Sequence, residues 1–322
     1  MNTKQQLVNL IWILAMSNEV NLHFRKAGLL TTIQDQGRSG YQAFGVPVAG
    51  ALDQTAAKTA NFLVGNVPNA PVLEITLIGP EIVVNGDCQI AICGANLSPT
   101  CNGTFLPMYE TVHLKDGDSI KFGRAQNGCR AYLAVGGQWL IKPWLGSYSA
   151  SAQNGLELTP ESLIRKEIQL KIIPAPFIDK RIIAPSERQS YPTSLRVRVL
   201  PGPEFASFSA LAIGYFFSHA YKVSRDSNRM GYRLEGQRID FHPENEVISA
   251  GIIPGTIQVT NAGHAILLLA DAQTTGGYHR IANVIQADLD KLAQLKPGDE
   301  IWFSLITLEE AKQLNQNEVY PS

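Results

Sequence analysis

Charged residues are scarce in this sequence, and neither sign dominates. Asp, Glu, Lys and Arg make up 17% of the 322 residues, and 27 basic against 28 acidic side chains give a formal net charge of −1. A balanced chain exerts no long-range attraction on polyanions, so neither nucleic acid nor an anionic membrane is an expected partner. Because 45% of the residues are hydrophobic, a disordered chain is excluded as well.

The sequence also lacks the common motifs of metal, nucleotide and biotin chemistry. Its four cysteines form no C-x-x-C pair and its six histidines are scattered singly, so we predict reduced thiols and no metal site. No P-loop, H-E-x-x-H or G-x-S-x-G motif occurs, and no G-x-G-x-x-G opens a helix. No methionine stands in the A-M-K-M context of a biotinylated lysine. We therefore expect no nucleotide motif and no covalently attached biotin in this chain.

Residues 6–15 form the one concentrated apolar run near a terminus. The run is too short to span a bilayer, but it mimics a short secretory signal. Since Met16 opens a normal polar lead into a first strand, we predict that residues 1–21 are an extension, that Met16 is the start, and that the protein is cytoplasmic. Export, which would place the cysteines in an oxidising compartment, is the alternative.

Hydrophobic periodicity predicts a mainly β protein with a few helices. Alternation with period 2 recurs between turn residues at 89–92, 119–122, 167–172, 196–199 and 256–259. A helix is expected from a cap at Asp53 to a stop at Gly65, and another in the segment that Pro203 opens. Short helical pieces are expected near 289–295 and 309–314.

One internal repeat suggests that the chain holds two related β-barrel units. Residues 114–122 match residues 295–303 in type at six of nine positions, and each copy is typical of a turn followed by a strand. We predict a first unit at 22–175, a linker at 176–192 and a second unit at 193–322. Chance recurrence of a common turn and strand is the alternative.

Three stretches concentrate glycine, arginine, aspartate and amides in a way that a core does not need. In the first, at 31–47, Gln34, Asp35 and Arg38 offer convergent polar groups, although a surface turn with an Asp–Arg pair would look the same. In the second, at 227–233, two arginines flank Gly231 and could bind a carboxylate, carbamate or phosphate. An exposed hairpin is the alternative there.

The third stretch, at 271–278, follows the buried-looking strand 266–270, and small-molecule sites are often assembled just past a strand end. A Gly-Gly turn with a capping aspartate is its structural alternative. Weaker candidates are Glu74 and Arg130, which are charges inside apolar strands, and Ser147 and Ser149, which are typical of turns.

Together these stretches resemble the carboxyltransferase family that includes the C subunit of 5-oxoprolinase, allophanate hydrolase subunit 2 and half of the carboxyltransferase region of urea carboxylase. The resemblance is carried by GLLTTIQDQGRSGYQAFGVPVAGALDQTAAKTANFLVGN (28–66), LEITLIGP (73–80), RAYLAVGG (130–137), SNRMGYRLEG (227–236), PGTIQV (254–259) and LLADAQTTGGY (268–278). It spans nearly everything after residue 22.

The resemblance implies two cyclophilin-like β-barrel units and tight pairing with a kinase-inhibitor-like protein, the B subunit of 5-oxoprolinase. It further implies a complex, completed by an A subunit, that uses ATP to hydrolyse 5-oxo-L-proline to L-glutamate. Two alternatives stay open. One is transfer of a carboxyl group from carboxybiotin to urea or a related amide, and the other is non-catalytic regulation of the kinase-inhibitor-like partner.

The motifs supply candidates for each role in handling a lactam or ureide substrate. Asp35 and Asp271 are the predicted proton-transfer residues. The predicted substrate-binding residues are Gln34, Arg38, Arg229, Tyr232, Arg233, Gln258, Gln273, Thr274, Thr275 and Tyr278. From these roles, Arg229→Ala and Gln273→Ala are expected to abolish turnover and to leave folding intact.

The chain departs from the family pattern at Ala27, Ala150, Ala250 and His279. Ala250 stands where an acidic residue is frequent. If that acid were a general base, its loss would lower the rate by roughly 10²- to 10⁴-fold, whereas loss of a structural salt bridge would leave the chemistry intact.

Overall fold

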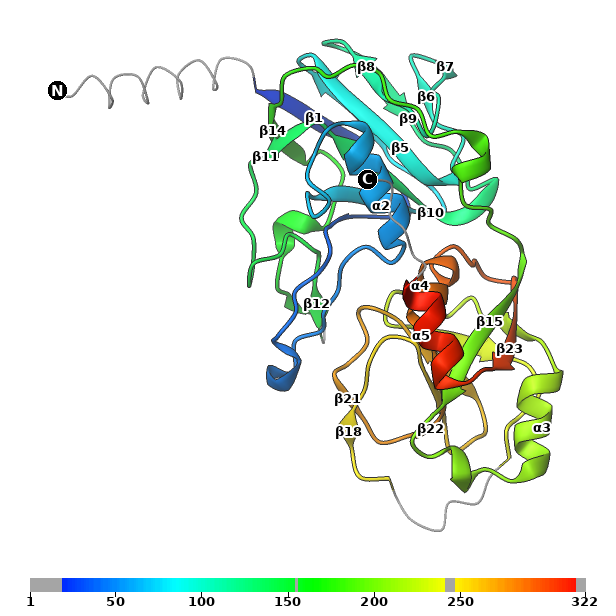
Figure 1. Cartoon of the computed structure of the whole chain (residues 1–322). Helices are drawn as coiled ribbons and strands as arrows, with labels where there is room; N and C mark the ends of the chain where they lie inside the picture. Colours follow the sequence, from blue (N-terminus) through cyan, green and yellow to red (C-terminus); the bar gives the residue numbers. More distant parts are fainter. Residues whose placement is uncertain (1–18, 154–155, 241–246, 317–322) are drawn as a thin grey trace. The chain divides into compact units, whose positions relative to one another are not determined.

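The computed structural model describes residues 19–153, 156–240 and 247–316 (Figure 1). The apolar run at 6–15 and the expected start at Met16 lie outside these residues. The chain divides into two compact units: unit 1 contains residues 1–36 and 56–189, and unit 2 contains residues 37–55 and 190–322.

Unit 1 is built from two sheets of antiparallel strands and a short hairpin. The seven-stranded sheet has the order β11 (Gly137–Trp139), β14 (Gln169–Pro174), β1 (Val20–Lys26), β4 (Glu81–Asn85), β9 (Ser119–Lys121), β6 (Thr100–Cys101) and β7 (Thr104–Phe105). The five-stranded sheet has the order β2 (Leu30–Gln34), β3 (Val72–Thr76), β10 (Asn127–Val135), β5 (Cys88–Asn96) and β8 (Val112–Leu114). The hairpin pairs β12 (Ala152–Gln153) with β13 (Leu156–Glu157).

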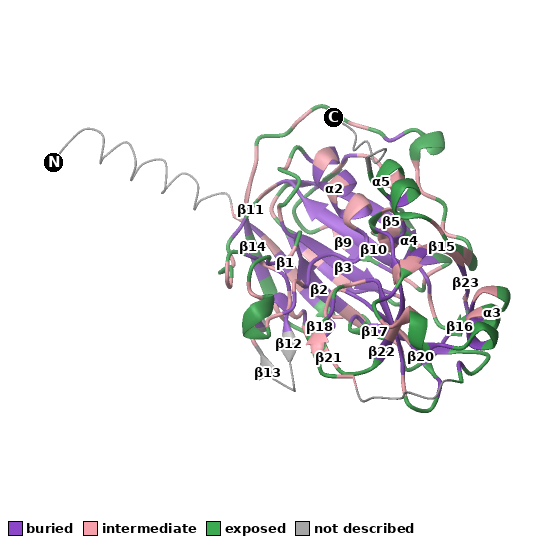
Figure 2. Cartoon of the chain, turned by 60° about the horizontal axis from the view of Figure 1, so that its bottom comes forward, coloured by how far each residue is buried: buried purple, intermediate pink, exposed green. Residues whose placement is uncertain are grey.

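The burial of these strands follows from their sequence patterns. In β1, Val20, Leu22 and Phe24 alternate with polar residues and are buried in one core cluster, as expected for a strand with one wet face. By contrast, β5 and β10 are almost continuously apolar and almost entirely buried (Figure 2). The core cluster of unit 1 therefore draws on both sheets, and β5 and β10 are its most deeply buried strands.

Unit 2 is a closed barrel of seven strands. Their order is β15 (Ser194–Pro201), β22 (His279–Val284), β19 (Thr256–Val259), β20 (Ala265–Leu268), β17 (Gly231–Glu235), β16 (Tyr221–Val223) and β23 (Glu300–Leu305). The barrel closes through parallel pairing of β15 with β23, which lie side by side in Figure 1. The other neighbours are antiparallel. Outside the barrel, β18 (Ala250–Gly251) pairs with β21 (Thr275–Gly276).

The helices are few, as the sequence predicts. They are α2 (Gln54–Leu63), α3 (Ala210–Ser218), α4 (Gln286–Leu292) and α5 (Leu308–Gln316), with 3-10 turns η1 (Gln42–Phe44), η2 (Pro160–Ser162), η3 (Pro185–Glu187) and η4 (Phe205–Ser207). Ser209 caps α3 by accepting a hydrogen bond from the Ala212 N–H. Among the described residues, none of the helices combines the length and the apolar character needed to cross a bilayer.

The predicted repeat forms the same turn in both units. In each copy, the lysine N–H donates to the aspartate side chain, and the glycine N–H donates to a valine carbonyl on a neighbouring strand. In unit 1, Lys115 donates to Asp118 at 2.7 Å and Gly117 donates to Val84 at 2.8 Å. In unit 2, Lys296 donates to Asp299 at 3.0 Å and Gly298 donates to Val223 at 2.8 Å. Both glycines have left-handed φ angles, 86° and 93°, which glycine adopts without strain. The shared geometry supports two related units.

The expectation of a mainly β protein with a few helices is confirmed. Two β-barrel units were expected, and within the described residues the closed barrel is unit 2. Within the described residues, the strands of unit 1 form two sheets and a hairpin. The boundaries also differ from the expected ones, because residues 37–55 belong to unit 2 and residues 176–189 to unit 1.

Hydrogen bonds explain both differences. The Ala49 N–H donates to the Ala270 carbonyl at 3.1 Å and Leu52 packs in the barrel core, which attaches the segment 37–55 to unit 2. In unit 1, the side chain of Gln89 bonds both backbone groups of Ile178, at 2.7 and 2.9 Å. The expected linker is therefore largely packed against the first unit.

Candidate functional site

Two cavities in the described part of unit 2 share one residue, Gln273. The larger has a volume of about 700 Å³ and the smaller about 290 Å³. Both border the segment that follows β20, where the sequence predicts a small-molecule site.

The larger cavity lies between three segments of unit 2. They are residues 42–48, residues 251–254 and residues 269–275, which include the predicted binding residues Thr274 and Thr275. The first segment is anchored at its end, because the Arg38 N–H donates to the Val48 carbonyl at 2.8 Å. Phe44 and Ile253 are 81% and 63% exposed, so apolar side chains stand at this side of unit 2.

The smaller cavity gathers four of the predicted binding residues, Arg233, Gln258, Gln273 and Tyr278. They come from β17, from β19 and from the segment after β20, and β20 lies between β17 and β19 in the barrel. Polar residues that the sequence did not single out also line it, namely Asp226, Asn228 and Thr260. Asn228 lies inside the 227–233 stretch, so the polar composition of that stretch could have identified it. Thr260 follows β19, and nothing in the sequence around it indicates a site.

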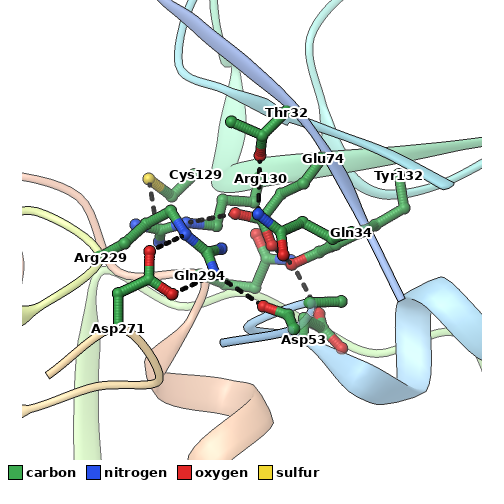
Figure 3. Close-up of polar contacts among 12 residues, drawn as sticks. Thr32, Gln34, Asp53, Glu74, Cys129, Arg130, Tyr132, Arg229, Asp271 and Gln294 are labelled. Atoms are coloured by element: carbon green, nitrogen blue, oxygen red, sulfur yellow. Dashed lines mark hydrogen bonds and ion pairs between the residues drawn. The ribbon is translucent and has the colours of Figure 1, made fainter. Parts of the chain in front are cut away.

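Arg229 and Asp271, two further predicted site residues, are bound to each other. The Arg229 Nε and Nη2 atoms donate to the two Asp271 carboxylate oxygens at 2.8 and 2.9 Å, and Nη2 also donates to the Gly50 carbonyl at 2.7 Å (Figure 3). Arg229 is buried. This bidentate pair clamps the segment 37–55 to the barrel, which favours a structural role. Substrate binding by Arg229 and proton transfer by Asp271 stay predictions.

Asp35, the other predicted proton-transfer residue, organises a turn in unit 1. Its Oδ1 accepts hydrogen bonds from the Ser147 and Ser149 hydroxyls at 2.6 and 2.5 Å, and its Oδ2 accepts from the Tyr148 N–H at 2.7 Å. The serines that the sequence marked as weak candidates are thus partners of Asp35 within one buried network.

Three other predicted residues have buried side chains. Tyr232 lies in the core of unit 2, where its hydroxyl donates to the Leu292 carbonyl at 2.9 Å, and it lines neither of the two cavities described above. In unit 1, Gln34 donates to the Thr32 hydroxyl at 3.0 Å. Arg38 is buried as well.

Unit 1 also holds a buried polar row on β3 and β10. The Glu74 and Arg130 side chains lie 3.6 Å apart, and the Tyr132 hydroxyl donates to Glu74 at 2.9 Å (Figure 3). The two charges inside apolar strands therefore form a pair, which is the structural interpretation of these residues.

An ion pair supports β18, next to the larger cavity. Arg280 donates to both carboxylate oxygens of Glu204, at 2.8 and 2.6 Å, and to the Gly251 carbonyl at 3.1 Å. The hydrogen bond from Arg280 holds the pKa of Glu204 below its ordinary value. The backbone that carries Ala250, the departure from the acidic residue, is thus held firmly, and Ala250 pairs with Gly276.

Among the residues that the structure describes, no three His, Cys, Asp or Glu side chains gather to hold a metal ion. The prediction of no metal site stays a prediction, as do those of ATP use and of no attached biotin.

The sequence matches the carboxyltransferase domain family, subdomains A and B, over residues 44–305. The chain therefore belongs to this family, and the expected resemblance is confirmed. The 5-oxoprolinase C subunit of Escherichia coli is 38% identical over 296 residues, which cover 91% of this chain and 94% of that protein. The corresponding protein of Haemophilus influenzae is 34% identical over 304 residues, covering 90% and 93%.

Larger proteins contain the same domain. The urea amidolyase of Saccharomyces cerevisiae is 31% identical over 316 residues, which cover 90% of this chain and 17% of that protein. The solved urea amidolyase of K. lactis has a TM-score of 0.86 at 28% identity, covering 93% of this chain and 19% of that chain. The Kluyveromyces lactis urea carboxylase has a TM-score of 0.83 at 28% identity and covers 93% and 28%.

Proposed function

We propose that this chain is the C subunit of an ATP-dependent 5-oxoprolinase complex, which hydrolyses 5-oxo-L-proline to L-glutamate in the cytoplasm. The observation that carries the proposal is the match to 94% of the length of the Escherichia coli C subunit. Proteins similar to the A and B subunits of 5-oxoprolinase, the latter kinase-inhibitor-like, are the proposed partners.

The chemistry of unit 2 supports a planar amide substrate. The smaller cavity offers two side-chain amides, Gln258 and Gln273, together with the Tyr278 hydroxyl and the Arg233 guanidinium. Amides and hydroxyls donate and accept hydrogen bonds, so they match the N–H and C=O groups of a lactam. A cationic side chain suits the carboxylate that a lactam acid carries.

The proposed reaction consumes one ATP and two waters. Transfer of the γ-phosphoryl group to the lactam oxygen releases ADP and makes that oxygen a leaving group. Attack of water at the carbonyl carbon and cleavage of the ring C–N bond then give an acyl phosphate, and a second water releases phosphate and glutamate. Because this sequence has no recognisable nucleotide motif, we assign ATP binding to the partners.

Carboxyl transfer from carboxybiotin to urea or a related amide is the second candidate. The likeness to urea amidolyase and urea carboxylase favours it. It requires a biotin-bearing partner. Non-catalytic binding of a kinase-inhibitor-like protein is the third candidate, and the exposed Phe44 and Ile253 favour contact with some protein.

The test is to co-express the chain with its candidate partners, purify the complex, and measure glutamate formed from 5-oxo-L-proline with and without ATP. ATP-dependent glutamate supports the proposal. If every protein of the complex is folded and associated and no glutamate forms, the proposal fails. Urea carboxylation with a carboxybiotin-bearing partner would then indicate the second candidate, and partner binding without turnover the third.

A matched pair of variants ties the activity to unit 2. Gln273 is exposed and lines both cavities, so Gln273→Ala should abolish turnover while folding and complex formation persist. Gln313→Ala, at an exposed position on α5, is the control and should retain full activity. Normal activity of the folded Gln273→Ala complex would contradict the assignment of the site.

A further inference from the structure

A row of three residues crosses the barrel wall beside the smaller cavity. On the adjacent antiparallel strands β17, β20 and β19, Arg233 pairs with Ile266, and Ile266 pairs with Gln258. Directly paired residues on neighbouring strands point to the same face. The Cα atoms of Arg233 and Gln258 are thus about 10 Å apart, two strand spacings, with Ile266 between them.

This row faces outward from the barrel. Side chains alternate along a strand, and Tyr232, Leu267, Ile257 and Val259, the neighbours of the row in sequence, lie in the barrel core. Arg233, Ile266 and Gln258 all line the smaller cavity. Ile266 therefore forms an apolar floor with a cationic residue on one side and an amide on the other.

Gln258 has a donor that the protein does not satisfy. Its side chain is 1% exposed, and its Nε2 has no hydrogen-bond partner among the described residues. A buried donor without an acceptor destabilises the folded protein, so an acceptor supplied by a ligand would be strongly favoured. The glycine at 276 covers this amide, since a Cβ there would lie 2.5 Å from Nε2.

Arg233 complements this donor. It is exposed, and its guanidinium makes no ion pair or hydrogen bond with the described residues, which leaves it available to an anion. Asp226, Asn228 and Thr260, at the same cavity, supply acceptors for an N–H group. The cavity thus matches a molecule that has a carboxylate, a carbonyl and an N–H on a small ring.

We propose that the smaller cavity is the subsite for a small cyclic amide acid, with its carboxylate at Arg233 and its ring carbonyl at Gln258 Nε2. The choice of 5-oxo-L-proline as the ligand rests on the proposed function. The orientation of the ligand rests on the row itself.

Direct binding to the full chain tests the orientation, measured by isothermal titration calorimetry with 5-oxo-L-proline and with pyrrolidin-2-one, which lacks the carboxylate. Arg233→Gln should weaken 5-oxo-L-proline about 10- to 100-fold, the range of one charge-assisted hydrogen bond, and leave pyrrolidin-2-one unchanged. Gln258→Leu should weaken both ligands by similar factors. Equal losses for both ligands in Arg233→Gln, or no binding to the wild-type chain, would overturn the proposal.

Two adjacent glycines give a steric test that changes no charge. Gly276→Ala places a methyl group against Gln258 Nε2 and should displace the amide and weaken both ligands. Gly277→Ala meets its nearest atom, the Val247 carbonyl oxygen, at 3.4 Å, an ordinary contact, so it should bind both normally. Unchanged binding by a folded Gly276→Ala protein would count against a role of Gln258.

These outcomes separate the subsite from the proposed function. If the binding pattern holds but the assembled complex forms no glutamate, the subsite stands and the 5-oxoprolinase proposal fails. If glutamate forms and substitution of Arg233 or Gln258 does not change the binding of either ligand, the subsite proposal fails and the proposed function stands.

Discussion

Arg229 offers the sharpest test of the distinction between a substrate-binding role and a structural one. The sequence predicts that Arg229→Ala abolishes turnover without affecting folding. In the structure, the guanidinium donates to both Asp271 carboxylate oxygens and to the Gly50 carbonyl, all within unit 2. We therefore expect the substitution to destabilise unit 2.

The size of the effect follows from burial. Removing one partner of a buried ion pair costs about 3–5 kcal/mol, because the other charge stays desolvated. The Asp271 side chain is 21% exposed, so water can partly replace the guanidinium, and we expect a loss near the lower end, about 3 kcal/mol. Arg229→Lys retains the charge but not the bidentate geometry and should lose about half as much.

Urea unfolding, followed by hydrogen exchange of the β17 and β20 amides, measures this loss in unit 2. Arg225→Ala is the control, since Arg225 is a nearby exposed arginine. In an Asp271→Ala background, Arg229→Ala should cost much less, because the charge left unpaired is gone. An Arg229→Ala protein as stable as Arg225→Ala, yet inactive, would refute the clamp and restore the substrate-binding interpretation.

Three further predictions concern single side chains. Burial alone would raise the pKa of Asp288, but hydrogen bonds from Arg198 outweigh it and hold the pKa below 3.8. A lowered folded pKa adds stability that is present above the unfolded pKa, about 4, and is lost as the pH falls through the folded value. In the Asp288→Asn protein, the free energy of unfolding measured in urea should therefore fall less steeply below about pH 4 than in the wild type. The same decrease in both proteins would contradict this. Asp35→Asn should destabilise unit 1 by about 1–3 kcal/mol in urea, whereas a proton-transfer residue would lose turnover at unchanged stability. Burial raises the pKa of the Cys88 thiol to about 12, so Cys88 should react with a disulfide reagent at about pH 8 only after denaturation. Cys101 is only part-buried and should react first when the thiols of the native protein are counted.

Local patterns were sufficient to predict several elements of this fold. The strands at 89–92, 119–122, 196–199 and 256–259 and the helix after Asp53 appear at or near their expected positions, because side-chain alternation and turn residues act over a few neighbours. The turn shared by 114–122 and 295–303 was predictable for the same reason, since its lysine and aspartate are three residues apart.

The roles of the candidate residues depended on distant contacts. The sequence treats Tyr232 and Arg233 as equivalent neighbours, yet strand alternation sends one into the core and the other to the cavity. Which neighbour faces inward is decided by how β17 pairs within the barrel.

The sequence by itself determined the family, the β character and the stretches from which the site is drawn. Only the tertiary structure decided that residues 37–55 join the barrel, that Arg229 and Asp271 bind each other, and that the Gln258 Nε2 donor is buried without a hydrogen-bond partner among the described residues. These facts depend on pairs of atoms from segments far apart in the chain, such as Ala49 with Ala270 and Arg233 with Ile266. No local pattern encodes such pairs, because burial and hydrogen bonding at each residue are set by whichever segments the closed barrel brings together.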